Sequence, residues 1–326
     1  MIDTPALINE LFTIPDSQVF EDVPLSRYTR FGIGGPAQVF FETASESSFM
    51  QALEVVERSA SPYVVIGGGT NLIVSDDGFD GVVLRFTAKH IGADGTHVTS
   101  AAGAVLQDLV DFTVAQGLAG IHTMTGIPGY VGAAVYGNAG AYGRSIAQSV
   151  ISVRFFDGAQ VRVFDNKECE FRYRESIFKR HKRWIIFSTT LELAPGDPGE
   201  LRHTASGILD VRNRKYPPTM KCAGSIFKNL LLKELPPSIQ SALPERVVIE
   251  GKVPSAYFLE QVGAKGMKNG DIHVADYHAN LIYNVGAGTA AQVVNVIAEL
   301  KKRVRERFGL ELEEEVQYVG FESVTL

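Results

Sequence analysis

Cysteine is scarce in this sequence of 326 residues, and metal-binding patterns are absent from it. Its two cysteines, Cys169 and Cys222, form no CxxC pair, and its seven histidines form no HExxH motif. Thiolate and histidine metal centres show such spacings, so no metal is expected. Two free thiols suit a reducing compartment, which predicts a cytoplasmic protein.

An excess of positive charge and a long apolar run are also missing. Lys and Arg number 31 against 37 Asp and Glu, a net charge of −6, so a nucleic-acid partner is not expected. An anionic ligand would need a local basic cluster. No uncharged apolar run approaches the roughly 18 residues of a membrane span, and no Lys or Arg precedes Arg27 as in a signal peptide. We therefore expect no membrane partner.

The composition is that of a folded protein, with 45% hydrophobic and 21% charged residues. The length suggests about two domains. In the first half, period-2 and apolar segments predict strands over 38–42, 63–66 and 81–86. Two amphipathic stretches predict helices, one capped by Ser45 and one ending near Gly117.

Strands separated by turns dominate the middle of the chain. A hairpin is predicted from 151–156 and 161–164, which flank an Asp-Gly turn, and a long strand follows over 184–193. Residues 195–199 combine turn-forming Pro, Gly and Asp with nothing apolar. We expect a linker and a domain boundary there.

A long helix is predicted near the C-terminus. Thr289 and Gln292 form a capping box, and Gly309 ends the pattern. The charge run 301–307 is most simply the solvated face of this helix, and a strand is predicted over 316–319. The apolar face of the predicted helix comprises Val293, Ile297, Leu300, Val304 and Phe308.

The first glycine-rich segment runs from Gly67 to Asn71 (GGGTN), directly after a predicted strand. Leu72 stands where a dinucleotide-binding GxGxxG motif needs its third glycine, and no Gly-Lys-Ser/Thr follows. Consecutive N–H groups here could form an anion-binding nest. A plain tight loop is the alternative, and the segment alone does not decide between them.

The second glycine-rich segment is TGIPGYVGAAVYGNAGAYG, from Thr125 to Gly143. Its small residues suggest main chain pressed against a large ligand or against another main-chain segment. Tight packing without a ligand is the alternative, but Thr125 and Asn138 add polar groups that packing would not need. Pro128 makes the loop stiff. Two such loops, with no Lys for a γ-phosphate, fit a diphosphate-bearing cofactor held by main chain.

Three polar segments follow, and each also has a plain structural interpretation. Arg174 lies among aromatic residues and an acid, where a surface salt bridge is the simple alternative. Ser225 fits no GxSxG motif and could be only a turn residue. The acidic run 311–315 could be a solvated edge before the last strand.

Taken in this order, the segments resemble the bacterial UDP-N-acetylenolpyruvoylglucosamine reductases, flavoenzymes of cell-wall precursor synthesis. Similarity extends over about 28–320, and the strings around Arg174 and Ser225 are the specific ones. The matching strings are TRFGIGGPA, VVIGGGTNLIVSDDGFDGVVLRF, GIPGYVGAAVYGNAGAYG, FRYRESIFK, CAGSIFKN, AKGMKNGDIHVADYHANLIYN and LEEEVQYVG.

This resemblance implies an α+β fold of two domains. The first, over 22–195, would be a vanillyl-alcohol-oxidase-type FAD-binding fold with subdomains of about 22–88 and 89–195. An α+β substrate-binding domain over 203–326 would follow, with its last strand, 315–320, near the flavin. Arg174 and Ser225 are only 51 positions apart in the sequence. This short separation and the HAN string at 278–280 resemble the family form that lacks an insertion in the substrate domain. Gly69-Thr70-Asn71 stands where covalent relatives carry Gly-His-Ser, so non-covalent FAD is expected.

The implied activity is reduction of the enolpyruvyl group of UDP-N-acetylglucosamine-enolpyruvate to UDP-N-acetylmuramate, with NADPH as reductant. That reaction serves peptidoglycan synthesis and therefore cell shape and division. The resemblance assigns the substrate carboxylate and the developing charge to Arg174 and the final proton to Ser225. Glu315 would help only in its protonated form, because a carboxylate would repel an enolate.

The resemblance also assigns binding residues. The residues expected at FAD are Gly67, Gly68, Gly69, Thr70, Asn71, Leu72, Thr125, Gly126, Ile127, Pro128, Gly129, Gly132, Ala133, Asn138, Ala139, Gly140, Tyr142 and Arg174. The residues expected at the substrate are Lys215, Tyr216, Gly224, Lys228, Asn229 and His278.

Three other functions remain open at this point. An FAD-dependent sugar or alcohol oxidase of the same fold would react rapidly with air once reduced. A non-catalytic relative would bind a UDP-sugar without NADPH-driven bleaching of a flavin. A domain with glycine-rich packing alone would purify colourless.

Overall fold

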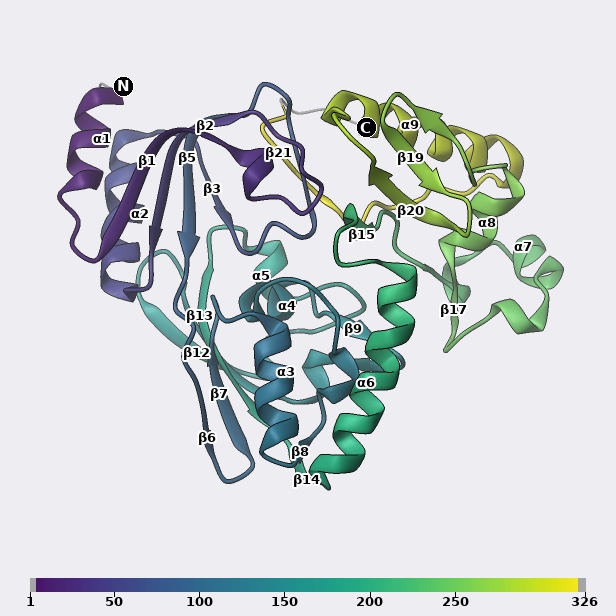
Figure 1. Ribbon diagram of the computed structural model, residues 1–326, viewed down its shortest axis with the longest axis horizontal. Helices are drawn as coiled ribbons and strands as arrows, with labels where there is room; N and C mark the ends of the chain where they lie inside the picture. Colours follow the sequence, from purple (N-terminus) through teal and green to yellow (C-terminus); the bar gives the residue numbers. More distant parts are fainter. Residues whose placement is uncertain (1–3, 322–326) are drawn as a thin grey trace. The chain divides into compact units, whose positions relative to one another are not determined.

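The computed structural model of the protein describes residues 4–321 (Figure 1). These residues divide into two compact units, each formed from separate parts of the chain. Unit 1 contains the N-terminal segment up to Val23 together with 37–68 and 80–218. Unit 2 contains 24–36, 69–79 and the chain from Thr219 onwards. Each unit is described below by itself.

Unit 1 begins with a four-stranded sheet in which β3 and β5 are parallel. Helix α2 (Glu46–Ser59) follows β2, and Ser45 caps it by accepting a hydrogen bond from the N–H of Ser48. Its apolar face is buried with the sheet's, and α1 (Thr4–Phe12) packs on α2. The sheet order is β1 (Ser17–Pro24), β2 (Pro36–Thr43), β5 (Phe79–Phe86), β3 (Tyr63–Ile66).

The second sheet of unit 1 is antiparallel and has five strands. Helix α4 (Val131–Tyr136) packs on β13 and β7, and α3 (Leu106–Ala115) contacts α4. Two further short pairs are β8 (Leu118–Ala119) with β14 (Ala194–Pro195) and β9 (Gly140–Ala141) with β10 (Arg144–Ser145). The sheet order is β12 (Val161–Asp165), β11 (Val150–Phe156), β13 (Ile185–Glu192), β7 (His97–Ala101), β6 (Ile91–Asp94).

The expected linker at 195–199 is wrong, because Pro195 ends β14 and Pro198 and Gly199 begin a long helix. Asp197 is the N-cap of α6 (Pro198–Lys215), accepting a hydrogen bond from the N–H of Glu200 at 2.9 Å, and Pro198 occupies the first turn. Only Leu201 of this helix is buried, so its sequence carries almost no apolar stripe. Helix α6 packs against α3 and η2 (His122–Met124) within unit 1.

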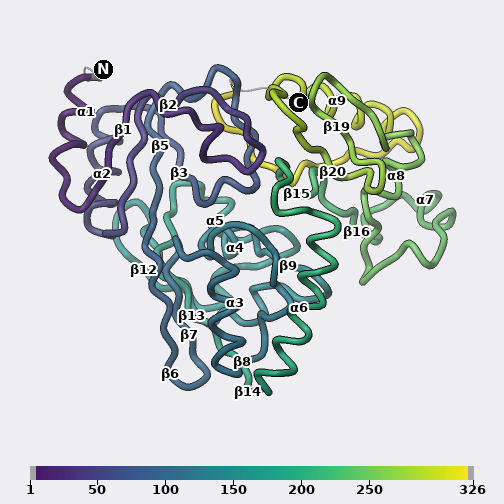
Figure 2. The backbone as a smooth tube through the Cα atoms, viewed as in Figure 1, coloured from purple at the N-terminus to yellow at the C-terminus, as the bar shows by residue number. Residues whose placement is uncertain are grey.

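Unit 2 is built on a four-stranded antiparallel sheet, with α8 (Ser255–Gln261) and α9 (Ala290–Phe308) packed on it. A separate parallel pair joins β21 (Gln317–Val319) to β4 (Leu72–Val74). Figure 2 shows this pairing as the yellow end of the chain beside a blue segment. The sheet order is β15 (Lys221–Ser225), β20 (His278–Asn284), β19 (Ile272–Ala275), β18 (Lys268–Asn269).

The remaining elements are short. Residues 230–253 contribute the pair β16 (Leu230–Leu231) and β17 (Lys252–Val253) with α7 (Pro237–Ala242) between them. Helix α5 (Ile177–Arg180) lies in unit 1. The other 3-10 turns are η1 (Leu25–Arg27), η3 (Ile146–Gln148), η4 (Leu232–Glu234) and η5 (Glu245–Val247).

Helix α9 confirms the sequence prediction at both ends. Thr289 and Gln292 form the expected capping box, and Gly309 ends the helix in the left-handed region at φ 66°. Its predicted apolar face is buried, apart from the partly buried Phe308. The charge run is solvated except at Lys301, which pairs with Glu314 at 2.8 Å. Both side chains of that pair are mostly buried, so an edge of solvated acids is the wrong description for Glu314.

The predicted domain limits of 22–195 and 203–326 stay a prediction, while the compact units divide the chain at other residues. Within residues 4–321 no helix is long and apolar enough to cross a membrane. The same residues contain no cluster of three His, Cys, Asp or Glu side chains placed to hold a metal ion.

Candidate active site

The two glycine-rich segments meet in unit 1. A Cβ atom added to Gly68 would lie 3.3 Å from the Cα of Gly129 and 3.3 Å from the ring of Tyr130. One added to Gly132 would lie 2.7 Å from the Cβ of Ala102. At Gly68 and Gly132, therefore, a missing side chain lets two parts of the main chain approach each other closely.

Gly67 and Gly137 have no such packing reason. A Cβ atom added at either position would meet nothing nearer than 3.6 Å, an ordinary contact distance. Neither residue has a positive φ. A Cβ atom at Gly67 would make ordinary contacts with Ala133 and Tyr130, and one at Gly137 would meet only the carbonyl oxygen of Ala133. Ala133 itself is small and exposed. No close contact inside the protein therefore requires glycine at either position.

Gly69 has a different explanation and belongs to unit 2. Its φ is +64°, and an added Cβ would lie 1.7 Å from the carbonyl oxygen of Tyr28. Its own carbonyl accepts a hydrogen bond from the N–H of Arg30 at 3.0 Å. The plain tight-loop interpretation therefore accounts for Gly69, whereas it does not account for Gly67.

Gln107 fixes the start of the second glycine-rich segment. Its Oε1 accepts a hydrogen bond from the N–H of Gly126 at 2.6 Å, and its Nε2 donates to Oγ1 of Thr125 at 3.2 Å. Thr125 is almost fully buried. The sequence analysis did not identify Gln107, because a glutamine in the first turn of a helix is usually a solvated residue.

Asn138 connects the second glycine-rich segment to the Arg174 segment. Its φ is +42°, and its Nδ2 donates to the carbonyl oxygen of Arg172 at 2.8 Å. Its Oδ1 accepts from the N–H of Ala147 at 3.3 Å. The polar group that suggested a ligand thus serves the protein's own main chain on both sides.

Arg174 sits in a tight turn, which we call the arginine turn (172–175). The main chains of Arg172 and Glu175 exchange hydrogen bonds of 2.9 and 3.1 Å, and Arg174 has a φ of +57°. A bulky residue in this left-handed region costs free energy and is often found at functional sites. The Nη1 of Arg174 donates to the carbonyl oxygen of Gly140 at 3.2 Å. This contact joins the guanidinium to the second glycine-rich segment.

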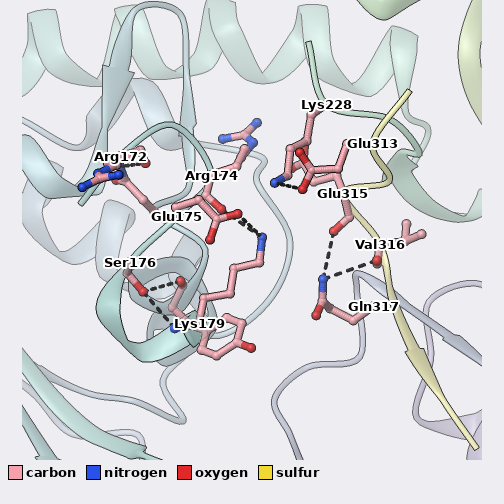
Figure 3. A network of polar contacts seen from close by, with 12 residues as sticks. Arg172, Arg174, Glu175, Ser176, Lys179, Lys228, Glu313, Glu315, Val316 and Gln317 are labelled. Carbon is pink, nitrogen blue, oxygen red and sulfur yellow. Dashed lines mark hydrogen bonds and ion pairs between the residues drawn. The ribbon is translucent and has the colours of Figure 1, made fainter. Parts of the chain in front are cut away.

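Lys179 holds the arginine turn from below (Figure 3). Its ammonium donates to the carbonyl oxygen of Arg174 at 3.0 Å and to the carboxylate of Glu175 at 2.9 Å. Ser176 caps α5 and donates to the carbonyl oxygen of Tyr136 at 2.7 Å. The turn is therefore attached to both neighbouring helices, α4 and α5.

In unit 2 the structure brings Ser225 and Glu315 close in the main-chain network. Ser225 ends β15 and pairs with Leu281 of β20. The N–H of Glu315 donates to the carbonyl oxygen of Ile226, the next residue after Ser225, at 2.7 Å. Arg174 belongs to unit 1, and its contacts there are those of the arginine turn described above.

Asn280 holds the segment that follows Ser225, and the sequence analysis had noted it only within the HAN string. Its side chain accepts from the N–H of Phe227 at 2.9 Å and donates to the carbonyl oxygen of Phe227 at 2.8 Å. It also donates to Oγ of Ser255 at 2.8 Å. Asn280 is 3% exposed, so these bonds form without competing water.

Lys228 is buried at 8% exposure and forms an ion pair with Glu313 on the next segment (Figure 3). The N–H of Lys228 also donates to the carbonyl oxygen of Glu313 at 2.9 Å. Gly224, just before Ser225, has a φ of +75° and nothing within 4 Å of an added Cβ. His278 accepts a hydrogen bond at Nδ1 from the N–H of Asn280 at 3.2 Å. Gly224 thus directly precedes Ser225, and His278 bonds to Asn280, which holds the segment after Ser225.

Lys215 and Tyr216 lie at the C-terminal end of α6 in unit 1. The Nζ of Lys215 is 5.1 Å from the centre of the Tyr216 ring, and the Cζ of Arg212 is 5.7 Å from it. Tyr142 is exposed at the tip of the hairpin between β9 and β10, with a φ of +51°. Lys215 and Arg212 thus place two positive charges beside the Tyr216 ring.

Two family models match the chain. One, described as an FAD binding domain, matches residues 37–164. The other, described as the C-terminal domain of UDP-N-acetylenolpyruvoylglucosamine reductase, matches residues 216–319. Together they cover the glycine-rich segments and the segments around Ser225 and Glu315.

Similar proteins cover nearly the whole chain. The UDP-N-acetylenolpyruvoylglucosamine reductase of Solibacter usitatus is 63% identical over 307 residues, which is 94% of this chain and 98% of that protein. The one of Rubrobacter xylanophilus is 36% identical and covers 92% of this chain and 94% of its own. The crystal structure of the reductase from Thermus caldophilus matches with a TM-score of 0.73 at 29% identity, covering 93% of this chain and 99% of that one.

Proposed function

Because the chain belongs to the UDP-N-acetylenolpyruvoylglucosamine reductase family, we propose that it reduces UDP-N-acetylglucosamine-enolpyruvate to UDP-N-acetylmuramate with NADPH. It is an FAD-dependent oxidoreductase with the expected α+β fold. The observation that carries the substrate assignment is the 63% identity to the Solibacter reductase over 94% of the chain. The reaction would serve peptidoglycan synthesis in the cytoplasm.

FAD supplies hydride transfer between NADPH and the alkene, and unit 1 offers the main chain to bind it. The glycines at positions 67 and 137 support this assignment, since no close contact inside the protein requires them. The close approach at Gly68 and Gly132 holds the two glycine-rich segments in fixed positions. The other predicted FAD residues stay a prediction, as does non-covalent binding.

Arg174 is proposed to bind the substrate carboxylate and the negative charge that builds beside it. A guanidinium binds a carboxylate through two parallel hydrogen bonds and stays charged at all relevant pH values. The left-handed main chain and the bond to Gly140 support this role, because they orient the side chain before substrate arrives.

Ser225 is proposed to donate its hydroxyl proton to the substrate's α-carbon, and Glu315, in its protonated form, to donate a hydrogen bond to the developing enolate. The support is that Glu315 bonds to the main chain of the residue after Ser225, which links their positions. A weak acid such as serine can protonate only a strongly basic carbon, which the enolate provides. Lys215, Lys228 and Asn229 are proposed to face the phosphates and carboxylate of the substrate. The other proposed substrate-binding residues are Tyr216, Gly224 and His278.

The test uses the visible spectrum of the purified protein under anaerobic conditions. NADPH should bleach the flavin, and the enolpyruvyl substrate should restore its colour. Ser225→Ala should be bleached normally but should recover very slowly, while the exposed Ser241→Ala should match wild type. Wild-type recovery in Ser225→Ala would refute the proton-donor role. Rapid recovery in air with none from the enolpyruvyl substrate would indicate an oxidase instead.

A further inference from the structure

We propose that Asn71 is a positioning residue that fixes the main chain of Glu315. The proposal rests on the proposed function, because it takes Glu315 as a carboxyl group next to the reacting alkene. Asn71 itself lies at the end of the first glycine-rich segment, where its sequence context suggested a direct contact with FAD.

The contacts of Asn71 point to Glu315. Its side-chain Nδ2 donates to the carbonyl oxygen of Glu315 at 2.9 Å. Its own carbonyl oxygen accepts from the N–H of Gln317 at 2.9 Å. Asn71 therefore bonds to both sides of Val316, and the parallel pairing of β4 with β21 begins at the next residue, Leu72 with Gln317.

Glu315 is held from its other side as well. Its N–H donates to the carbonyl oxygen of Ile226 at 2.7 Å. Both peptide groups that flank the Glu315 side chain are thus fixed, one by the segment after Ser225 and the other by Asn71. The Glu315 carbonyl also receives a longer bond of 3.4 Å from Nε2 of Gln317 (Figure 3).

These bonds matter because Glu315 lies outside regular secondary structure. Glu314 forms an isolated bridge with Phe227, and the strand begins only at Gln317. No continuous ladder fixes the residue between them, so individual hydrogen bonds set the direction of its side chain. Two of these bonds come from side chains, and the bond from Asn71, at 2.9 Å, is shorter than the bond from Gln317, at 3.4 Å.

Two variants test the proposal, and both are measured in the FAD-loaded full chain. Asn71→Asp keeps the shape but replaces the donating nitrogen by an oxygen, which repels the Glu315 carbonyl. Asn71→Ala removes the side chain without adding charge. Asn269→Asp is the matched control, since Nδ2 of Asn269 donates to the carbonyl oxygen of Gln292 at 3.3 Å in the same unit and outside the site.

We expect recovery of the flavin colour by the enolpyruvyl substrate to slow about 10- to 100-fold in both Asn71 variants, as is typical when a supporting residue is lost. Bleaching by NADPH and the Kd for FAD, measured by flavin fluorescence, should stay within about twofold of wild type, since the proposal assigns the side chain of Asn71 to Glu315 and not to FAD. A weakened Kd for FAD with slowed bleaching would instead make Asn71 a direct cofactor contact and overturn the proposal.

A double variant shows whether Asn71 acts through Glu315. Asn71→Asp combined with Glu315→Leu, which removes the hydrogen-bond donor, should recover no more slowly than Glu315→Leu alone. Multiplied losses would overturn the proposal. If Glu315→Leu alone recovers at the wild-type rate, the proposed role of Glu315 fails and the inference fails with it. If Glu315→Leu is slow but both Asn71 variants are normal, only the inference fails.

Discussion

The side chain of Asn280 makes three hydrogen bonds in a site closed to water, so its loss should destabilise unit 2 strongly. We consider Asn280→Leu, which keeps a side chain of similar size. The change removes the partners of the N–H and the carbonyl of Phe227, and one partner of the hydroxyl of Ser255. Phe227 and Ser255 are 1% and 0% exposed, so water cannot replace the lost bonds.

Each buried polar group left without a partner costs about 1–3 kcal/mol. The hydroxyl of Ser255 also lies 3.4 Å from the carbonyl oxygen of Phe227 and can compensate that group in part. We therefore expect the free energy of unfolding to fall by about 3 kcal/mol. Urea denaturation of the FAD-loaded protein, followed by circular dichroism, measures it.

Asn166→Leu provides the matched control. Its Nδ2 donates to the carbonyl oxygens of Ala147 and Val150 at 2.8 and 2.7 Å, but Asn166 is exposed. The bond to Ala147 is exposed, so water can replace it, whereas the bond to Val150 is partly buried. A loss of about 1 kcal/mol is therefore expected. A loss of similar size in both variants, or a loss below about 1 kcal/mol in Asn280→Leu, would refute the burial argument.

Three further predictions concern unit 1. Gly67→Ala should leave the thermal stability of the apoprotein unchanged, because its Cβ meets nothing nearer than 3.6 Å. It should weaken FAD binding by about 1–3 kcal/mol, which is about 5- to 150-fold. Gly207→Ala is the control, and unchanged FAD affinity in Gly67→Ala would contradict the proposed binding of FAD at Gly67. Lys179→Met should slow recovery of the flavin colour by about tenfold, because the arginine turn loses the bonds that Lys179 makes to it. Lys302→Met removes only an exposed ion pair and should recover at the wild-type rate. Equal recovery rates in the two variants would count against the role of the arginine turn. Burial raises the pKa of the Cys169 thiol to about 12, so the thiol loses its proton at a lower pH in the unfolded chain than in the folded protein. The free energy of unfolding should therefore fall by up to about 1.4 kcal/mol per pH unit between roughly pH 9 and 12. The same pH slope in Cys169→Ala would show that another group is responsible.

Local signals explain which elements could be predicted from the sequence. Helix α9 was predicted to within a residue because its capping box and its terminal glycine act within a few residues of each helix end. The β11–β12 hairpin was predicted from its Asp-Gly turn, and its strands pair from Phe156 with Val161 onwards. Strand β3 at 63–66 is confirmed as predicted.

Helix α6 was missed because its apolar signal is nearly absent. A helix with one buried side chain shows no stripe, and the Pro-Gly-Asp-Pro-Gly segment before it is typical of a linker. Its stability comes instead from the Asp197 cap and from Arg and Lys in its last turn. These residues at its two ends are therefore the sequence signal from which α6 could have been predicted.

The supporting residues of the site lie beyond sequence reasoning for another reason. Asn280 and Phe227 are 53 positions apart, and Asn71 and Glu315 are 244 apart. No local pattern indicates which distant carbonyl an amide will meet. Glycines could be singled out from the sequence, but only the surroundings of each one separate Gly69, which needs its conformation, from Gly67, which does not.

The parallel pair of β4 with β21 places a constraint on the order of folding. Among the residues that the structure describes, β4 pairs only with β21, which comes 245 positions later in the chain, from Leu72 to Gln317. Until residues 317–319 have been synthesised, residues 72–74 therefore lack their partner strand, although the β-hairpins of unit 1 can already close. Such distant pairing costs loop-closure entropy and slows folding. The pairing of these two strands should thus be a late step in folding.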